Sequence, residues 1–208
     1  TRPTTVGVIN LIRDAFKDDE NVVIKMDYHN KGMMRLLKSD IKTYDVGMIV
    51  LTNEMFNDRN KVKDLANLRL PIFKLGNDLN QSIKRIVVVL NDVNSYEQIS
   101  PVVFDVSSQL KTKTRIFDMD PIGEHEDKSN LLDHFENLAK IFNEKVEIIT
   151  DDKNPVRELK KQENFLQILP FKESMLKRRF SWRFLYTNPD LIFFDMKKYS
   201  QLLVPVIE

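Results

Sequence analysis

The chain has 208 residues and a formal net charge of +1, with 32 basic and 31 acidic side chains. This balance argues against a bulk nucleic-acid binder, because such proteins carry a clear basic excess. Cysteine is absent, which excludes disulfides, thiolate metal sites and cysteine nucleophiles. With 42% apolar and 30% charged residues, the composition is typical of a globular protein. No apolar run reaches the ~20 residues needed to span a membrane.

The charge is unevenly distributed along the chain. Residues 1–84 carry a net charge of +3, residues 85–152 carry −7 and residues 153–208 carry +5. An acidic middle beside a basic end favours complementarity within the chain or between subunits, and chance placement of solvated charges is the alternative. The first periodic segment follows Thr1 almost directly, and no Met precedes it. We therefore expect the chain to be a piece of a longer protein.

Short apolar runs alternate with helical stripes in the first part of the chain. Val/Ile/Leu-rich runs bounded by polar residues are typical of strands buried on both faces, and apolar spacings of three and four residues predict helices. The predicted strands lie at 22–26, 46–51 and 71–75, and the predicted helices at 8–16, 33–41 and 62–68. The polar stretch 76–84 contains Gly76 and Asn77 and predicts a domain boundary.

The second part shows the same alternation more clearly. Strands are predicted at 85–90, 114–119, 146–150, 165–169 and 202–207. Helices are predicted at 99–110, with Pro101 in the first turn, at 129–142, with Ser129 as N-cap, and at 155–162. Strands alternating with helices predict a mainly parallel α/β sheet, in which ligands bind beyond the carboxyl ends of the strands. We therefore expect two Rossmann-like, doubly wound units in tandem, residues 1–78, which lack an opening strand, and residues 84–208.

Residues 84–208 resemble a universal-stress-protein domain in the order of their elements and in three strand-end motifs. These are KRIVVVLNDVNSYEQ, TRIFDMDP and LLVPVI. The resemblance implies ligand-binding positions at Asp92, Asp118 and Asp120. ATP-binding members carry a glycine-rich phosphate loop after the fourth strand, but LPFKESMLKRRFSWRFLYTN contains no glycine. Without glycine the backbone cannot approach a phosphate closely, so the sequence argues against ATP binding of the family type.

Residues 1–84 resemble either the trailing part of another universal-stress unit or the nucleotide-binding half of RCK domains, which regulate potassium channels and transporters. In the RCK alternative, RPTTVG stands where G-x-G-x-x-G is expected, and it contributes Thr4 and Gly7. Asp27 lies 20 residues beyond Gly7, where that motif expects a ribose-binding acid. His29 lies near Asp27 at a strand's carboxyl end and is either a ligand or a helix-entry residue. YDVGMIVLTN resembles the later strand that borders the ligand crevice.

An acidic loop offers a second candidate site. Carboxylates and an imidazole could hold a hard cation there, with ligands Asp118, Asp120, Glu124 and His125. The spacing is not that of an EF-hand, and a solvated acidic loop is the alternative. The sequence therefore leaves two alternatives for the ligand of the chain, a nucleotide or a divalent or monovalent cation.

A basic and aromatic stretch is the third candidate site. Lys177, Arg178 and Arg179 precede Phe180 and Trp182, and such a combination can bind phosphate and stack bases. There are two alternatives to a ligand site in this stretch. It could form an amphipathic helix that binds a membrane or partner, or a surface helix with buried aromatic side chains. No G-x-S-x-G elbow, H-E-x-x-H motif or complete P-loop is present, so we do not expect an enzyme.

The two resemblances imply a cytoplasmic regulatory domain of a bacterial cation transport protein, a potassium channel or transporter or otherwise a cation:proton antiporter. Such a domain would form a homo-oligomer, would continue into a membrane-embedded pore or transporter domain of the same polypeptide, and would bind no nucleic acid. It would lie at the cytoplasmic face of the inner membrane. The alternative is a free-standing universal-stress-type nucleotide-binding protein. A hydrolase or nucleotidyl-transfer enzyme on the same scaffold would need a convergent catalytic set, which the sequence does not contain.

Overall fold

The computed structural model describes residues 32–77, 82–90, 93–118, 126–142, 145–149, 161–173 and 194–207. The chain divides into two compact units, residues 1–44 and 45–208. The described part of the first unit contains helix α2 (Met33–Tyr44), which confirms the helix predicted there. The strand predicted at 22–26 and the helix predicted at 8–16 lie outside the described residues.

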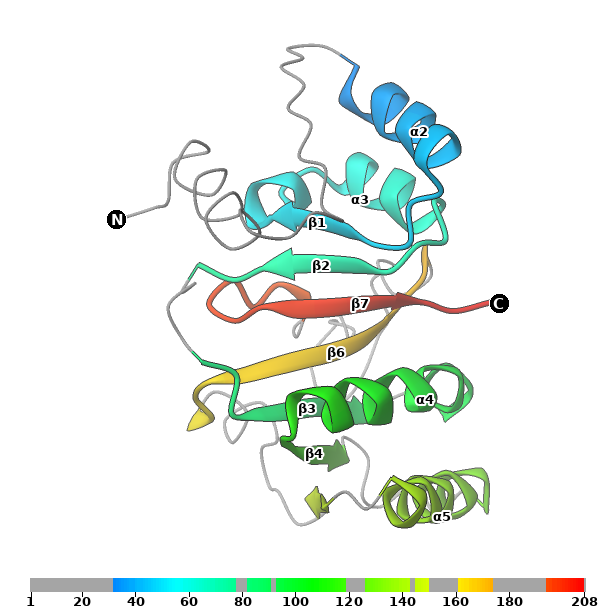
Figure 1. The fold of residues 1–208 in the computed structure, drawn as a ribbon, viewed down its shortest axis with the longest axis vertical. Coiled ribbons are helices and arrows are strands. Elements are labelled where there is room, and N and C mark those ends of the chain that lie inside the picture. Colours follow the sequence, from blue (N-terminus) through cyan, green and yellow to red (C-terminus); the bar gives the residue numbers. More distant parts are fainter. Residues whose placement is uncertain are drawn as a thin grey trace, which may run out of the picture. The chain divides into compact units, whose positions relative to one another are not determined.

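The second unit contains a seven-stranded sheet with the order β1-β2-β7-β6-β3-β4-β5 (Figure 1). Neighbouring strands are parallel except for β2 and β7, which are antiparallel. Each strand lies within a few residues of a predicted one. The strands are β1 (Ile49–Thr52), β2 (Ile72–Leu75), β3 (Arg85–Leu90), β4 (Lys113–Asp118), β5 (Val146–Ile149), β6 (Phe165–Phe171) and β7 (Gln201–Pro205).

The described strands of the two halves share one sheet, whereas the sequence predicts a separate sheet for each half. The antiparallel pair β2–β7 joins the halves, with Ile72 opposite Leu203 and Lys74 opposite Gln201. An unpaired edge strand exposes a row of N–H and C=O groups, and pairing β2 with β7 removes two such edges. The parallel pairs β1–β2 and β6–β7 therefore flank the junction and run in opposite directions. Apolar periodicity identifies strands but does not show that strands from different halves pair.

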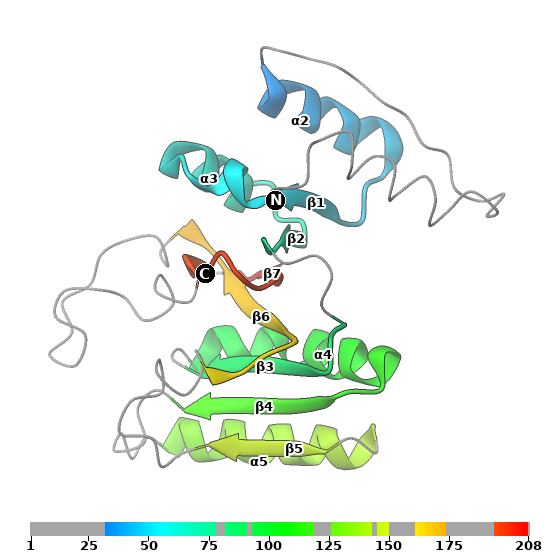
Figure 2. The same ribbon diagram turned by 90° about the vertical axis from the view of Figure 1, so that its left-hand side faces the viewer.

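Helices connect the parallel strands. The short helix η1 (Asn53–Phe56) and α3 (Arg59–Ala66) lie between β1 and β2, and the Asp58 side chain caps α3 by accepting a hydrogen bond from the Asn60 N–H, 2.9 Å. Helices α4 (Val93–Leu110) and α5 (Glu126–Ile141) follow β3 and β4. Both cover the same face of the sheet (Figure 2). Because α5 begins at Glu126, Ser129 lies within the helix, and the prediction that it is the N-cap is wrong.

Helix α4 also begins earlier than the sequence predicts, so Pro101 lies inside it and not in its first turn. Proline has no N–H to donate to the carbonyl group four residues earlier, here that of Glu97. The buried Ser100 hydroxyl donates to this carbonyl instead, 2.8 Å, and supplies the missing hydrogen bond. The Ser100 oxygen also lies 2.9 Å from Nε2 of His134 on α5, which links the two helices.

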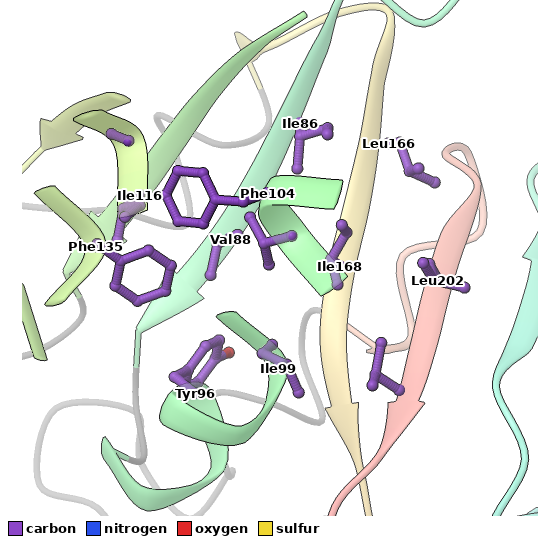
Figure 3. Packing of buried hydrophobic residues seen from close by; sticks show 13 residues of the cluster. Ile86, Val88, Tyr96, Ile99, Phe104, Ile116, Phe135, Leu166, Ile168 and Leu202 are labelled. Atoms are coloured by element: carbon purple, nitrogen blue, oxygen red, sulfur yellow. The ribbon is translucent and has the colours of Figure 1, made fainter. Parts of the chain in front are cut away.

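The main hydrophobic core lies between the sheet and these two helices (Figure 3). Alternate residues of the strands point into it, and the rings of Phe104 and Phe135 lie 5.8 Å apart at its centre. Its labelled members are Ile86, Val88, Tyr96, Ile99, Phe104, Ile116, Phe135, Leu166, Ile168 and Leu202. On the opposite face, Val87 and Val89 are also buried, which explains why β3 is an unbroken apolar run. Among the described residues, none of the helices is long and apolar enough to cross a membrane.

Candidate functional site

The strand order places a topological switch point between β3 and β6. The chain passes from β3 to β4 and β5 on one side, whereas β6 and β7 lie on the other side of β3. In sheets of this kind, ligands bind in the crevice outside the carboxyl ends of the two strands at the switch point. The described residues at this place are the first turn of α4, which follows β3, and residues 172–173, which follow β6.

Two polar side chains meet across the switch point. Lys172 directly follows β6, and its Nζ donates to Oγ of Ser95 in the first turn of α4, 2.7 Å. Ser95 is 1% exposed, whereas Lys172 is half-buried at the end of a fully buried strand. The next residue, Glu173, forms an ion pair with Lys63 of α3, 3.4 Å. An ammonium group and a hydroxyl group at this position can both donate to the oxygens of an anionic ligand.

Asp118 is the last residue of β4 and lies opposite Leu90 of β3. The backbone of Asp118 therefore ends at the same edge of the sheet as the Ser95–Lys172 pair, as the sequence predicts. The structure does not describe its side chain. The other predicted site residues lie outside the described residues: Thr4, Gly7, Asp27, His29, Asp92, Asp120, Glu124, His125, Lys177, Arg178 and Arg179. Within the described ranges, no group of three acidic or histidine residues is placed to hold a metal ion, and the predicted metal site falls outside those ranges.

A buried lysine lies at the β2–β7 junction. The side chain of Lys74 is 2% exposed, and its Nζ donates to the Phe194 carbonyl group and to Oε1 of Gln201, the latter at 2.9 Å. The rings of Phe194 and Phe56 lie 4.5 Å and 5.2 Å from Nζ, a cation–π arrangement. Burial lowers the pKa of Lys74 from 10.5 to about 8, while the carboxylate of Asp195 raises this pKa and the ammonium of Lys197 lowers it.

The Lys74 ammonium begins a polar row that crosses three strands. Gln201 of β7 lies opposite Lys74 of β2 and opposite Gln167 of β6. The Gln201 amide donates to Oε1 of Gln167, 2.8 Å, and both glutamines are fully buried. Within the described residues, Nε2 of Gln167 has no hydrogen-bond partner. The two halves of the sheet therefore meet at a polar row inside an otherwise apolar interior, where unmatched polar groups are costly.

Close backbone packing closes the junction at the end of β2. The Gly76 N–H donates to Oγ of Ser200, 3.0 Å, and the Asn77 N–H donates to the Lys197 carbonyl group, 2.9 Å. Nδ2 of Asn53 donates to the same carbonyl group, 3.0 Å. A Cβ atom at position 76 would lie 2.5–2.6 Å from backbone atoms of residues 198–200. Only glycine fits this close approach of two chain segments.

Sequence reasoning missed Ser95, Lys172 and Lys74. Lys172 directly follows a strand whose carboxyl end was predicted to border a ligand, so this position in the sequence could have identified it as a site residue. Lys74 is the lone charged residue in PIFKL, and the two-residue period of a strand places it on the same face as the buried Ile72. That pattern could have predicted a buried charge.

No protein-family model matches the chain, and no curated protein matches its sequence. Three solved structures are similar in fold. A functionally unknown protein from Pseudomonas aeruginosa PAO1 has a TM-score of 0.57 at 10% identity, with 99% of this chain and 79% of that chain covered. A candidate universal stress protein from Pseudomonas aeruginosa UCBPP-PA14 has a TM-score of 0.55 at 11% identity, with coverage of 99% and 80%. A universal stress protein from Archaeoglobus fulgidus DSM 4304 has a TM-score of 0.55 at 10% identity, with coverage of 97% and 77%.

The chain therefore has a universal-stress-protein-like, mainly parallel α/β fold. This agrees with the resemblance found in residues 84–208. The same comparisons show neither an RCK domain nor a link to a channel or antiporter.

Proposed function

We propose that the chain is a non-catalytic, ligand-binding module of the universal-stress type, with an anionic, phosphate-bearing ligand at the switch point between β3 and β6. A nucleotide held by these side chains, without the glycine-rich loop of ATP-binding members, is the first ligand class to test. The observation that carries the proposal is the hydrogen bond between Lys172 and Ser95, because it places two donor groups at this crevice. Donors from both sides of the crevice can bind one anion together, so a ligand would connect α4 with the end of β6.

The β2–β7 pair connects the candidate ligand site with the first half of the chain, so ligand binding could affect that half. Lys172 directly follows strand β6, which pairs with β7, and β7 pairs with β2. The Glu173–Lys63 ion pair adds a second connection to α3. We infer that residues 45–77 are the closing part of a second universal-stress-type unit. The pair β1–β2, connected through α3, meets β7–β6 in antiparallel register, and the similarity to the solved structures spans both halves.

A thermal-shift titration of the full chain with ATP, ADP, AMP and inorganic phosphate tests the proposal. A ligand at ~100 times its Kd stabilises the native state by about 2.7 kcal/mol. For a domain of this size that corresponds to an increase in Tm of about 5–10 °C. Lys172→Met removes a charged donor, and the affinity of the ligand should fall by about 10- to 100-fold.

Lys140→Met is the matched control, because this exposed lysine of α5 lies on a different element and its loss changes the net charge equally. The control should keep the affinity of the wild-type chain. The proposal is wrong if none of the four ligands raises the Tm, or if Lys172→Met binds a ligand as tightly as the control does.

Attachment to a cation channel or antiporter, location at the inner membrane and homo-oligomer formation stay predictions from the sequence resemblance. A longer sequence of the same protein with membrane spans would support the first two. Light scattering of the purified chain measures the third.

A further inference from the structure

The amino ends of β3, β4, β5, β6 and β7 share one edge of the sheet, opposite the candidate ligand site. Figure 2 shows the arrows of β3, β4 and β5 pointing in the same direction, and β6 and β7 are parallel to them. Every one of these strands is preceded by, or begins with, an exposed lysine. We call this set the lysine edge; it consists of Lys84, Lys111, Lys113, Lys145, Lys161, Lys197 and Lys198.

Few acids oppose this charge in the described turns. Glu147 forms an ion pair with Arg115, 2.7 Å, so its carboxylate already has a basic partner. Glu163 and Asp195 are the other acidic residues in the described segments that lead into these strands. Within the described segments that lead into these five strands, the lysine edge therefore has a positive excess, whereas the whole chain carries only +1. Glu54 and Asp58 follow the carboxyl end of β1 at the same edge, beside the Asn57 that accepts from Lys197.

Helix ends explain only part of the pattern. Lys111 and Lys145 follow the carboxyl ends of α4 and α5, where a cation is stabilised by the helix dipole. Lys84 and Lys113 do not directly follow a described helix, and Lys197 donates to Oδ1 of Asn57, a neutral acceptor, at 3.0 Å. These side chains are exposed, so packing of the core does not require them either.

We propose that the lysine edge docks the protein on the anionic surface of a phospholipid membrane. Neighbouring strands are about 4.8 Å apart, so the lysines of five strands spread over about 19 Å along one edge. Clusters of four to eight basic residues are the size that binds anionic lipid, and long lysine side chains can reach a common plane. Among the described residues that lead into these strands, Tyr199 is buried, and the ring of the exposed Phe142 already stacks on Phe104 of the core. This argues against stacking of bases from single-stranded nucleic acid.

This orientation would leave the candidate ligand site accessible. Lys172 and Ser95 lie at the carboxyl ends of β6 and β3, a strand length of six or seven residues away from the lysine edge. At ~3.3 Å per residue the two edges are about 20 Å apart. A ligand could therefore bind while the opposite edge contacts the membrane.

Co-sedimentation of the full chain with vesicles tests the proposal. The probes are vesicles of pure phosphatidylcholine and vesicles with about one third phosphatidylglycerol, at low and high salt. We expect binding to the anionic vesicles only, with strong weakening at high salt because the charges are screened. Lys84→Gln, Lys113→Gln and Lys145→Gln combined should lower the partition coefficient by at least about tenfold, since each lysine near an anionic surface contributes severalfold.

The matched control combines Lys38→Gln, Lys42→Gln and Lys61→Gln, three exposed lysines of α2 and α3. It changes the net charge equally and should keep most of the binding. Circular dichroism of both triple variants checks that they fold. Equal binding to neutral and anionic vesicles, or equal loss in both triple variants, would overturn the proposal. So would binding of the lysine edge to an acidic polypeptide such as polyglutamate without binding to anionic vesicles.

Discussion

Replacing Lys74 by methionine tests whether a buried cation lies at the β2–β7 junction. The pKa of Lys74 falls from 10.5 to about 8 on folding, mainly because burial removes the ammonium from water. Between these two values the unfolded chain holds the proton more often than the folded chain does. Stability therefore rises with pH across this window. From about pH 7 to about pH 9.5, the free energy of unfolding should increase by about 2 kcal/mol because of this one group.

Urea unfolding at a series of pH values measures the effect. Lys74→Met keeps a side chain of similar length but has no titrating group, so the increase of about 2 kcal/mol should be missing from the variant. Taking the difference between the two proteins removes contributions from other titrating residues. Lys61→Met, which replaces an exposed lysine of α3, should retain the increase. The reasoning is refuted if the wild-type chain and Lys74→Met show the same dependence of stability on pH.

Two further predictions concern the backbone. Gly76→Ala should destabilise the protein by about 1–3 kcal/mol in urea unfolding, because the new Cβ would meet backbone atoms at 2.5–2.6 Å. Gly47→Ala, with nothing within 4 Å of its Cβ, should change stability little, and equal effects of the two would contradict the close approach. Ser100→Ala should cost about 1 kcal/mol, because the Glu97 carbonyl group loses its donor beside Pro101. Pro101→Ala restores a backbone N–H that can donate to the Glu97 carbonyl group. In a double-mutant cycle, Ser100→Ala should therefore destabilise the Pro101→Ala variant less than it destabilises the wild-type chain. An equal loss of stability in both would show that the Ser100 hydroxyl does not replace the backbone hydrogen bond.

Much of the fold could be predicted because the strands of the second unit are short and mostly apolar. The central strands β6 and β7 are buried, whereas the edge strands β1 and β5 are partly exposed. Residues 86–89 of the run RIVVVL are buried on both faces, and β3 has the predicted bounds. The start of α4 was missed because residues 94–98 are mostly polar, and Tyr96 is the one residue among these five that packs into the core. The pairing of β2 with β7 was missed because it is a backbone contact between strands far apart in sequence. Periodicity within either strand does not specify that contact.

The sequence predicts the location of the candidate site in the sheet better than it predicts the residues that form the site. The rule for doubly wound sheets predicts the carboxyl ends of β3, β4 and β6, and the backbone of Asp118 lies there. Ser95 and Lys172 were missed because a serine in a helix and a lysine after a strand are common residues with no motif around them. Their proximity depends on the order of the strands, which places β6 beside β3.

An NMR titration of the isotope-labelled chain with ATP, and separately with inorganic phosphate, tests the central claim most directly. Backbone amide shifts report which residues sense the ligand, independently of any variant. The account predicts that the largest shifts occur at Ser95 and Lys172, at the carboxyl ends of β3 and β6. Largest shifts at Lys113 and Lys145 on the opposite edge, or no shift at Ser95 and Lys172 with either ligand, would contradict it.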